Sequence, residues 1–262
     1  MRVLFAGDIH GNTDHMSWVG RQAHAEGCDY IVACGDFGYW PHFEFGQSFL
    51  RHVDDVCRDA GVNLVWVDGN HENHDVLSSL RGDGDDLVFT GERHAWLPRG
   101  AVIQLGDLTV MGHGGAYSVD WEDRAEGVSW WRGETISEGD LRRLAERELP
   151  AVDILVTHEA PLPEVLTYKD LIPESLAQRD RVTDIVEMVE PSLVFCGHHH
   201  RRASFFTDPT ASGRQVRVNV LGRDTMGNES VFVMDMTQAD VERVRSEETF
   251  VSVVDGNEIL HR

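Results

Sequence analysis

The chain has 262 residues, of which 41% are hydrophobic and 26% are charged, and its formal net charge is −22. This length is enough to bury a full hydrophobic core. The acidic balance argues against a protein that binds nucleic acid non-specifically, because the surface repels a phosphate backbone, although bound cations would reverse the sign locally.

The cysteines and the first residues of the chain indicate the cellular compartment of the protein. Cys34 and Cys196 lie in apolar, strand-like segments, which predicts reduced and buried thiols of the kind found in cytosolic proteins. The N-terminus enters a strand directly, and no segment reaches the ~20 apolar residues that span a bilayer. These features predict a cytoplasmic protein with no membrane partner.

Apolar runs and amphipathic patterns alternate through the first third of the chain. This alternation favours an α/β fold built on a mainly parallel sheet, in which ligands gather beyond the carboxyl ends of the strands. The first helix is expected to be capped by Thr13 or Asp14. The expected strands are 3–6, 30–34 and 64–67, and the expected helices are 15–26, 43–60 and 74–80.

The middle of the chain turns to short strands and a long loop. Gly106-Asp107 separates two of these strands, 101–105 and 108–111, and predicts a β-hairpin. The stretch 112–135 is rich in glycine and tryptophan and is expected to be an ordered loop of a length that is often functional. Its tryptophans either cover a pocket and stack on a flat group, or pack the loop onto the core.

The last part of the chain ends in a β-rich tail. Ser137, with Asp140 three residues later, predicts a helix with a capping box. The two β-rich regions are expected to form a second sheet packed on the first. A single domain over residues 1–262 is expected, because the polar segments between residues 8 and 200 must meet. The expected strands are 87–89, 154–156, 193–196, 203–206, 216–220 and 230–234, and the expected helices are 137–147 and 176–189.

Five short polar segments each follow an apolar, strand-like run. They gather carboxylate, amide and imidazole groups at strand ends. Such a set suits two divalent ions held side by side, and paired metals most often serve the hydrolysis of phosphate esters. The side chains concerned are Asp8, His10, Asp36, Asn70, His71, His158, His198 and His200.

Two of these segments have informative spacings. In Asp8-x-His10, both side chains point to the same side of an extended chain and can hold one ion. Asn70 offers a neutral oxygen ligand, and His71 beside it offers an acid or base. The alternative for Asn70 is the N-cap of a helix.

Histidines supply the two later segments. Alternation along Gly197–His200 places His198 and His200 on one side and His199 on the other. The alternatives are a surface cluster and, for His158, a hydrogen-bonded histidine at a strand end. The order and spacing of all five segments favour a shared site.

The five segments, in order, match the pattern D-x-H, G-D, G-N-H-[D/E], H and G-H-x-H. On these motifs, which cover most of the chain, the protein resembles the calcineurin-like metallophosphoesterase superfamily. Three further segments, 35–41, 114–120 and 129–131, look like those of small prokaryotic and phage members. The resemblance implies a four-layer αββα sandwich, in which two mixed β-sheets are flanked by helices.

The resemblance also implies a role for each residue. His71 would steady the phosphoryl group or protonate the leaving oxygen, while a hydroxide that bridges the two metals attacks phosphorus. The donors suit Mn²⁺, Fe or Zn²⁺ better than Ca²⁺, and Mn²⁺ is favoured. The implied ligands are Asp8, His10 and His200 for one ion, Asn70, His158 and His198 for the second, and Asp36 as the bridge.

One position departs from the family pattern. Family members commonly carry an aspartate three residues after the bridging aspartate, and that aspartate orients the catalytic histidine. Tyr39 stands there in this chain. Either another group orients His71, with Asp68 and Glu72 as nearby candidates, or proton donation matters less because the substrate has a good leaving group.

The expected function is the hydrolysis of small phosphodiesters, with 2′,3′-cyclic nucleotides as a leading example. The alternative is a phosphomonoesterase acting on small metabolites or phosphoproteins. A non-catalytic scaffold with the same fold is less favoured because every matched ligand position is intact, and a metal-storage or sensor role would not need His71. The sequence predicts no particular oligomeric state.

Overall fold

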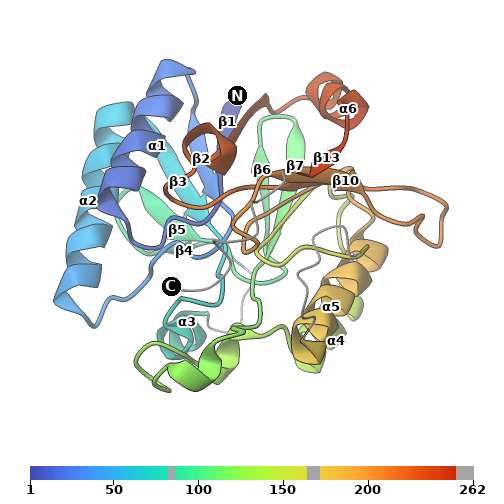
Figure 1. The fold of residues 1–262 in the computed structure, drawn as a ribbon. Helices are drawn as coiled ribbons and strands as arrows, with labels where there is room; N and C mark the ends of the chain where they lie inside the picture. Colours follow the sequence, from blue (N-terminus) through green and yellow to red (C-terminus); the bar gives the residue numbers. More distant parts are fainter. Residues whose placement is uncertain (82–85, 164–171, 252–262) are drawn as a thin grey trace.

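The computed structural model describes residues 1–81, 86–163 and 172–251 (Figure 1). The strands are β1 (Arg2–Ala6), β2 (Tyr30–Ala33), β3 (Asn63–Trp66), β4 (Val88–Phe89), β5 (His94–Trp96), β6 (Val102–Leu105), β7 (Leu108–His113), β8 (Ile154–Thr157), β9 (Leu193–Cys196), β10 (Ala203–Phe206), β11 (Arg217–Val220), β12 (Val231–Asp235) and β13 (Phe250–Val251). The helices are α1 (Thr13–Ala25), α2 (Glu44–Ala60), α3 (His74–Leu80), α4 (Glu138–Ala145), α5 (Pro173–Val189) and α6 (Gln238–Ser246).

Two mixed β-sheets form the centre of the fold. The first has six strands in the order β12-β1-β2-β3-β5-β4, and the second has seven in the order β13-β10-β11-β9-β8-β7-β6. Strands β1, β2, β3 and β5 run parallel in the first sheet, as do β7, β8, β9 and β11 in the second. The antiparallel strands lie at or next to the edges.

The two sheets pack face to face, and helices cover both outer faces (Figure 1). Between the sheets, Phe5 of β1 stacks on Phe195 of β9 with ring centroids 4.0 Å apart. Leu4 and Ile31 point the opposite way, because side chains alternate along a strand, and enter a core with α1 and α2. On the far side, Leu155 belongs to a core with α4 and α5. The predicted four-layer αββα sandwich is confirmed.

The composition of the sheets differs from the prediction in three respects. Strands β12 and β4 do not join the second sheet but pair antiparallel with β1 and β5 of the first sheet. The second sheet is built around the buried parallel strands β8 and β9 rather than from the β-rich regions alone. Strand β5 was not predicted, because three residues are too few to leave a periodic pattern, and it pairs parallel with β3.

Helix capping is partly as predicted. The N-cap of α1 is Asn12 rather than Thr13 or Asp14, because the Asn12 side chain accepts hydrogen bonds from the first-turn backbone N–H groups. Ser137 and Asp140 form the predicted capping box at the start of α4. The residue that caps each of these helices is therefore the one whose side chain reaches the free backbone N–H groups of the first turn.

Two other predictions are confirmed by the structure. The hairpin between β6 and β7 forms, with Leu105 paired to Leu108. Cys34 and Cys196 are buried and free, as are the other two cysteines. Within the described ranges, the helices are too short or too polar to cross a bilayer.

Candidate metal centre

The five polar segments meet at one edge of the sandwich. They follow β1, β2 and β3 in the first sheet and β8 and β9 in the second. Because these strands run parallel within each sheet, their carboxyl ends lie side by side. The contacts that follow connect all eight predicted side chains into one cluster.

Asp36 lies at the centre of the cluster. Its Oδ2 atom lies 3.3 Å from Nε2 of His10, 3.3 Å from Nε2 of His158 and 3.7 Å from Nε2 of His71. Its Oδ1 atom accepts hydrogen bonds from the backbone N–H groups of Asn70 and His71, each at 3.0 Å. One carboxylate oxygen therefore faces three imidazole nitrogens, as a ligand shared between two ions would.

The surrounding histidines keep the two buried carboxyl groups ionised. Burial alone would raise the pKa of Asp36, but His158, His71 and His10 outweigh burial and hold the pKa well below its usual range. For Asp8, burial is likewise outweighed by neighbouring histidines, and the pKa is lowered to about 2. Both side chains are thus carboxylates at neutral pH, as metal ligands must be.

Asp8, His10 and His200 form one group of donors, whose ligand atoms lie within 4.8 Å of one another. Nε2 of His200 lies 3.2 Å from Oδ2 of Asp8, a buried oxygen that makes no hydrogen bond with the described residues. His10 presents Nε2 to the group, because its Nδ1 donates to Asp224 at 3.2 Å. A buried carboxylate oxygen among imidazole nitrogens suits a divalent cation.

His158 and Asn70 form a second group around Asp36. Nδ1 of His158 donates to the backbone carbonyl of Cys34 at 2.8 Å, so Nε2 is the nitrogen that the ring presents to the cluster. That nitrogen lies 3.1 Å from Oδ1 of Asn70 and 3.3 Å from Oδ2 of Asp36. Although burial lowers the pKa of His158, Asp36 and Asp8 outweigh burial and raise it to about 10, so without metal the Nε2 proton lies between these oxygens. A cation bound there would replace that proton. Asn70 is not a helix cap, since Asn73 caps α3.

His198 lies beside His158 and is contacted by Glu159. The two histidine rings are 5.0 Å apart, and Nε2 of His198 lies 3.5 Å from Oε2 of Glu159. The other oxygen of this carboxylate lies 2.7 Å from Nε2 of His199. The predicted alternation of these histidines is therefore wrong, because β9 ends at Cys196 and His198 has a left-handed backbone, with φ 66°, that breaks the extended chain.

Several site residues have a strained backbone. Positive φ is sterically unfavourable for residues other than glycine, and such strain clusters at functional sites. Six non-glycine residues in the described part of the chain have positive φ. Four of these six are predicted ligands, namely His10, Asp36, His198 and His200.

Two glycines of the motifs are required by close approach. A Cβ atom on Gly69 would lie 2.2 Å from Oδ1 of Asp36, and one on Gly197 would lie 2.1 Å from Oδ1 of Asp8. Both distances are far inside van der Waals contact. Any larger residue at either position would displace a carboxylate of the cluster.

His71 is in contact with an arginine rather than with a carboxylate that orients it. The two predicted candidates are engaged elsewhere: Asp68 accepts from Arg99 at 2.8 Å, and Glu72 accepts from two backbone N–H groups of the site loops. Nδ1 and Nε2 of His71 lie 3.2 Å and 3.0 Å from two nitrogens of Arg124. Burial lowers the pKa of His71 to about 4, and Arg124 acts in the same direction.

Tyr39 occupies the position where the family pattern has aspartate, and it belongs to the core instead of the site. Its ring is buried against Trp66, with centroids 5.1 Å apart. The next residue, Trp40, donates from Nε1 to the backbone carbonyl of His71 at 2.6 Å. This segment therefore supports the backbone of His71, not its ring.

Hydrogen bonds hold both ends of the loop between β7 and α4. The first end is bonded to Asn70 of the cluster, and the second is bonded through Arg99 to Asp68. Nδ2 of Asn70 donates to Oγ of Ser118, and Ser118 donates in turn to the buried carboxylate of Glu134. The buried guanidinium of Arg99 donates to Asp68 and to the three backbone carbonyls of residues 133–135. The loop thus fixes the amide of Asn70 and is itself fixed to the end of β3.

Of the two predicted roles for the tryptophans of this loop, the structure shows packing onto the core for one of them. Trp131 is 2% exposed and packs into the interior. Trp121 is 39% exposed and pairs with Trp130, their ring centroids 5.5 Å apart. One ring therefore anchors the loop, and a pair of rings lies closer to the surface.

Replacing Arg99 by alanine is expected to lower the free energy of unfolding by about 3–5 kcal/mol, because the Asp68 charge would be left buried and unpaired. The side chains of Arg99 and Asp68 are 8% and 1% exposed. Urea unfolding followed by circular dichroism measures the change. Arg58→Ala removes an exposed ion pair with Asp55 and is the control, expected to leave the midpoint unchanged. Equal midpoints for Arg99→Ala and wild type would contradict the anchoring role.

Four residues that support the cluster were not predicted from the sequence. Of these four, only Glu159 has a local sequence feature that points to the site, since it is an acidic residue directly after a ligand-type histidine. Asp224 contacts His10 across 214 residues of sequence, and no local pattern reports such a contact. Ser118 and Arg124 lie in a loop whose course depends on the tertiary anchors of Arg99 and Glu134.

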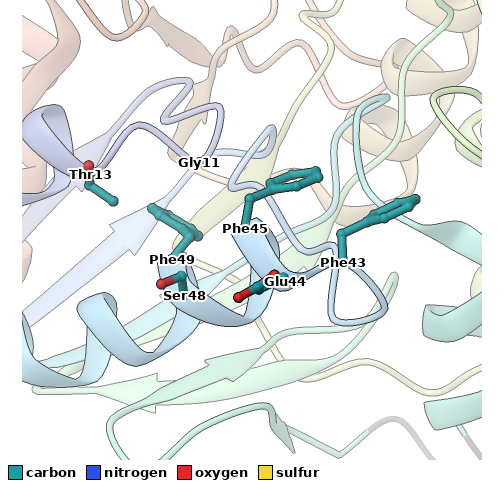
Figure 2. Close-up of a pocket in the computed structure, with 7 residues that line it drawn as sticks. All are labelled: Gly11, Thr13, Phe43, Glu44, Phe45, Ser48 and Phe49. Carbon is teal, nitrogen blue, oxygen red and sulfur yellow. The ribbon is translucent and has the colours of Figure 1, made fainter.

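An open pocket of about 670 Å³ is lined by residues near the starts of α1 and α2 (Figure 2). It lies between the segment that follows β1 and the start of α2. Figure 2 shows the rings of Phe43, Phe45 and Phe49 along it, and the first two stack with centroids 5.3 Å apart. Gly11, which lines the pocket, directly follows His10 of the cluster in the sequence.

The chain matches the family model of calcineurin-like phosphoesterases over residues 1–202. This range includes all eight residues of the cluster but not Asp224. An uncharacterized protein of Haemophilus influenzae is 20% identical over 229 residues, which cover 78% of this chain and 86% of the relative.

Solved structures share the fold at low sequence identity. The protein TT1561 of Thermus thermophilus is 17% identical with a TM-score of 0.54, over 95% of this chain and 98% of that one. A dimetal phosphatase from Danio rerio is 14% identical with a TM-score of 0.50, over 85% of this chain and 87% of that one. These similarities concern the arrangement of the sheets and helices.

Proposed function

The chain belongs to the calcineurin-like phosphoesterase family, and on that premise we propose that it hydrolyses small phosphodiesters with two divalent ions bound in the cluster around Asp36. The observation that carries the proposal is the approach of three Nε2 atoms, from His10, His158 and His71, to one oxygen of Asp36. The net charge of −22 favours a small substrate over a long polyanion.

The contacts support a division of the donors into two sets that share Asp36. Oxygen and imidazole donors together favour Mn²⁺, with Fe or Zn²⁺ as alternatives. The geometry around Asp8 and around His158 supports one ion at each place. The proposed ligands are Asp8, His10 and His200 for one ion, Asn70, His158 and His198 for the other, and Asp36 for both.

When bound, the two ions would activate a water molecule and neutralise charge on the phosphoryl oxygens. The residues of the chain prepare the site for this chemistry. Asp224 and the Cys34 carbonyl hold the Nδ1 protons of His10 and His158, so Nε2 of each ring remains a ligand. Asn70 contributes a neutral oxygen, which leaves more positive charge for the substrate than a carboxylate would.

The organic group of such a diester is proposed to lie in the pocket of Figure 2, one of whose lining residues, Gly11, directly follows the proposed ligand His10. An aromatic or nucleoside group there would stack on Phe43 or Phe45. This favours substrates such as 2′,3′-cyclic nucleotides. A phosphomonoesterase is the second candidate, because Arg124 adds a positive charge 3.0 Å from His71 that would favour a dianionic phosphate.

Removing and restoring metal tests the proposal. We expect chelator-treated protein to lose hydrolysis of bis-p-nitrophenyl phosphate and to regain it with Mn²⁺, with a lower rate on p-nitrophenyl phosphate. Ca²⁺ is the matched control ion and should not restore activity, because it prefers all-oxygen sites. Initial rates by p-nitrophenolate absorbance, with circular dichroism to verify folding, provide the measurement.

Each result of this experiment has a distinct meaning. A higher rate on the monoester would replace the diester by the second candidate. Bound ions without hydrolysis of either ester would contradict the enzymatic proposal and favour a scaffold. Activity that persists after complete removal of metal would contradict the role of the ions.

We further propose that residues 1–262 form one cytoplasmic domain. The core shared by the two sheets supports a single folding unit over the described residues. Four buried, free cysteines support a reducing compartment. Limited proteolysis that released two stable halves would contradict the single domain.

A further inference from the structure

Arg124 brings a guanidinium group to the rim of the cluster. It lies at the end of the 3₁₀ turn Trp121–Asp123, in the loop between β7 and α4. Its side chain is 13% exposed, and its NH2 atom lies 2.8 Å from Oδ1 of Asp120. The same guanidinium lies along the ring of His71, which itself lies 3.7 Å from Oδ2 of Asp36.

The contact between Arg124 and His71 has more donors than acceptors. A guanidinium only donates, and a neutral imidazole accepts at only one of its two nitrogens. Because two nitrogens of Arg124 lie 3.2 Å and 3.0 Å from the two ring nitrogens, at most one of these contacts is a hydrogen bond. The other contact sets an N–H group of each partner side by side with no acceptor between them, and an anionic oxygen bound beside them would accept from both.

The loop that carries Arg124 is anchored on both sides of it. Ser118 connects the start of the loop to Asn70, and Arg99 holds its end at residues 133–135. A fixed loop reduces the entropy lost when the side chain binds a ligand. Arg124 is thus presented to the site and not merely carried on a free surface segment.

We propose that Arg124 binds a non-bridging oxygen of the phosphoryl group, with His71 holding the guanidinium in place. The inference rests on the proposed phosphoesterase function and adds a substrate-binding residue to it. Guanidinium groups match the geometry of phosphate oxygens and donate two parallel hydrogen bonds. The arginine thereby supplies positive charge beside His71, in a chain that has Tyr39 where the family pattern has aspartate.

Substitution of Arg124 tests this role in the metal-loaded protein. Arg124→Ala is expected to lower kcat/KM for bis-p-nitrophenyl phosphate by about 10²–10³-fold, as for other preorganised donors to a reacting group. Arg124→Lys should retain an intermediate rate, because lysine keeps the positive charge but lacks the two parallel N–H donors of the guanidinium. Arg132→Ala is the matched control in the same loop, since Arg132 is 78% exposed and pairs with Glu126, and it should keep the wild-type rate.

Two readouts separate substrate binding from a structural role. Added guanidinium ion should raise the rate of Arg124→Ala and leave Arg132→Ala unchanged. The dissociation constant of inorganic phosphate, measured by calorimetry on the metal-loaded proteins, should rise by about 10–100-fold in Arg124→Ala, the loss expected for hydrogen bonds to a charged group. Metal content must equal that of the wild type in both variants.

The outcomes distinguish the inference from the proposed function. Wild-type rates and wild-type phosphate affinity in Arg124→Ala would overturn the inference and leave the phosphoesterase proposal intact. A loss of rate without rescue and with unchanged phosphate affinity would overturn it as well. If the wild type hydrolyses neither ester, the proposed function fails, and the phosphate measurement still decides whether Arg124 binds a phosphoryl oxygen.

Discussion

Asp36→Asn is expected to bind at most one ion per chain and to lose turnover by more than the ~10–100-fold typical of residues that only support a ligand. The substitution keeps the size of the side chain and removes its charge. Oδ2 of Asp36 faces Nε2 of both His10 and His158 at 3.3 Å, so a neutral amide would no longer serve both groups of donors. Metal content by mass spectrometry after desalting from Mn²⁺ measures the result.

A matched surface substitution controls for the loss of a carboxylate elsewhere. Asp55→Asn makes the same chemical change on the exposed face of α2, where Asp55 pairs with Arg58. It should leave both metal content and turnover at the wild-type level. Two ions per chain in Asp36→Asn would remove the bridging assignment, whatever the rate of that variant.

His71→Ala is expected to retain both ions and to lower turnover by about 10²–10⁴-fold, the range for a group that acts on the reacting atoms. His71 is proposed to contact the phosphoryl group and not to bind metal. The structure offers an alternative, because His71, His10 and Asp36 also form a group whose ligand atoms lie within 4.8 Å of one another. Metal content and turnover of the same preparation distinguish the two roles.

Three results of this experiment can be told apart. Full metal content with reduced turnover supports the catalytic role. Loss of one ion would make His71 a ligand, and unchanged turnover would remove it from the mechanism. His24→Ala, which removes an exposed histidine from the last turn of α1, is the control and should match the wild type.

The residues of the cluster were predictable because each follows a buried strand. Short apolar runs locate the strands, and parallel strands bring their carboxyl ends to one edge, so Asp8 and His200 meet although they lie in different sheets. Local patterns likewise predicted the capping box at Ser137 and the hairpin formed by β6 and β7. Such features depend on neighbouring residues and are therefore visible in the sequence.

The supporting contacts were not predictable because they depend on the tertiary course of the loops. Asp68 and Glu72 are near His71 in sequence. However, Asp68 accepts from Arg99 and Glu72 accepts from backbone N–H groups. Arg124 meets His71 across 53 residues, by a loop with few regular elements. Alternation failed at His198 for a related reason, since strained backbones at the site override the regular geometry of a strand.

The contact between Asp224 and His10 joins segments 214 residues apart, and Asp8 accepts from the backbone of His198 across 190 residues. Contacts of this range are slow to form, because a long loop must close before they contribute. A fragment that ends before residue 224 would lack part of the support of the cluster. Ions that bind only the completed cluster would stabilise the folded chain by mass action and slow its proteolysis, which links the lifetime of the protein to the supply of metal.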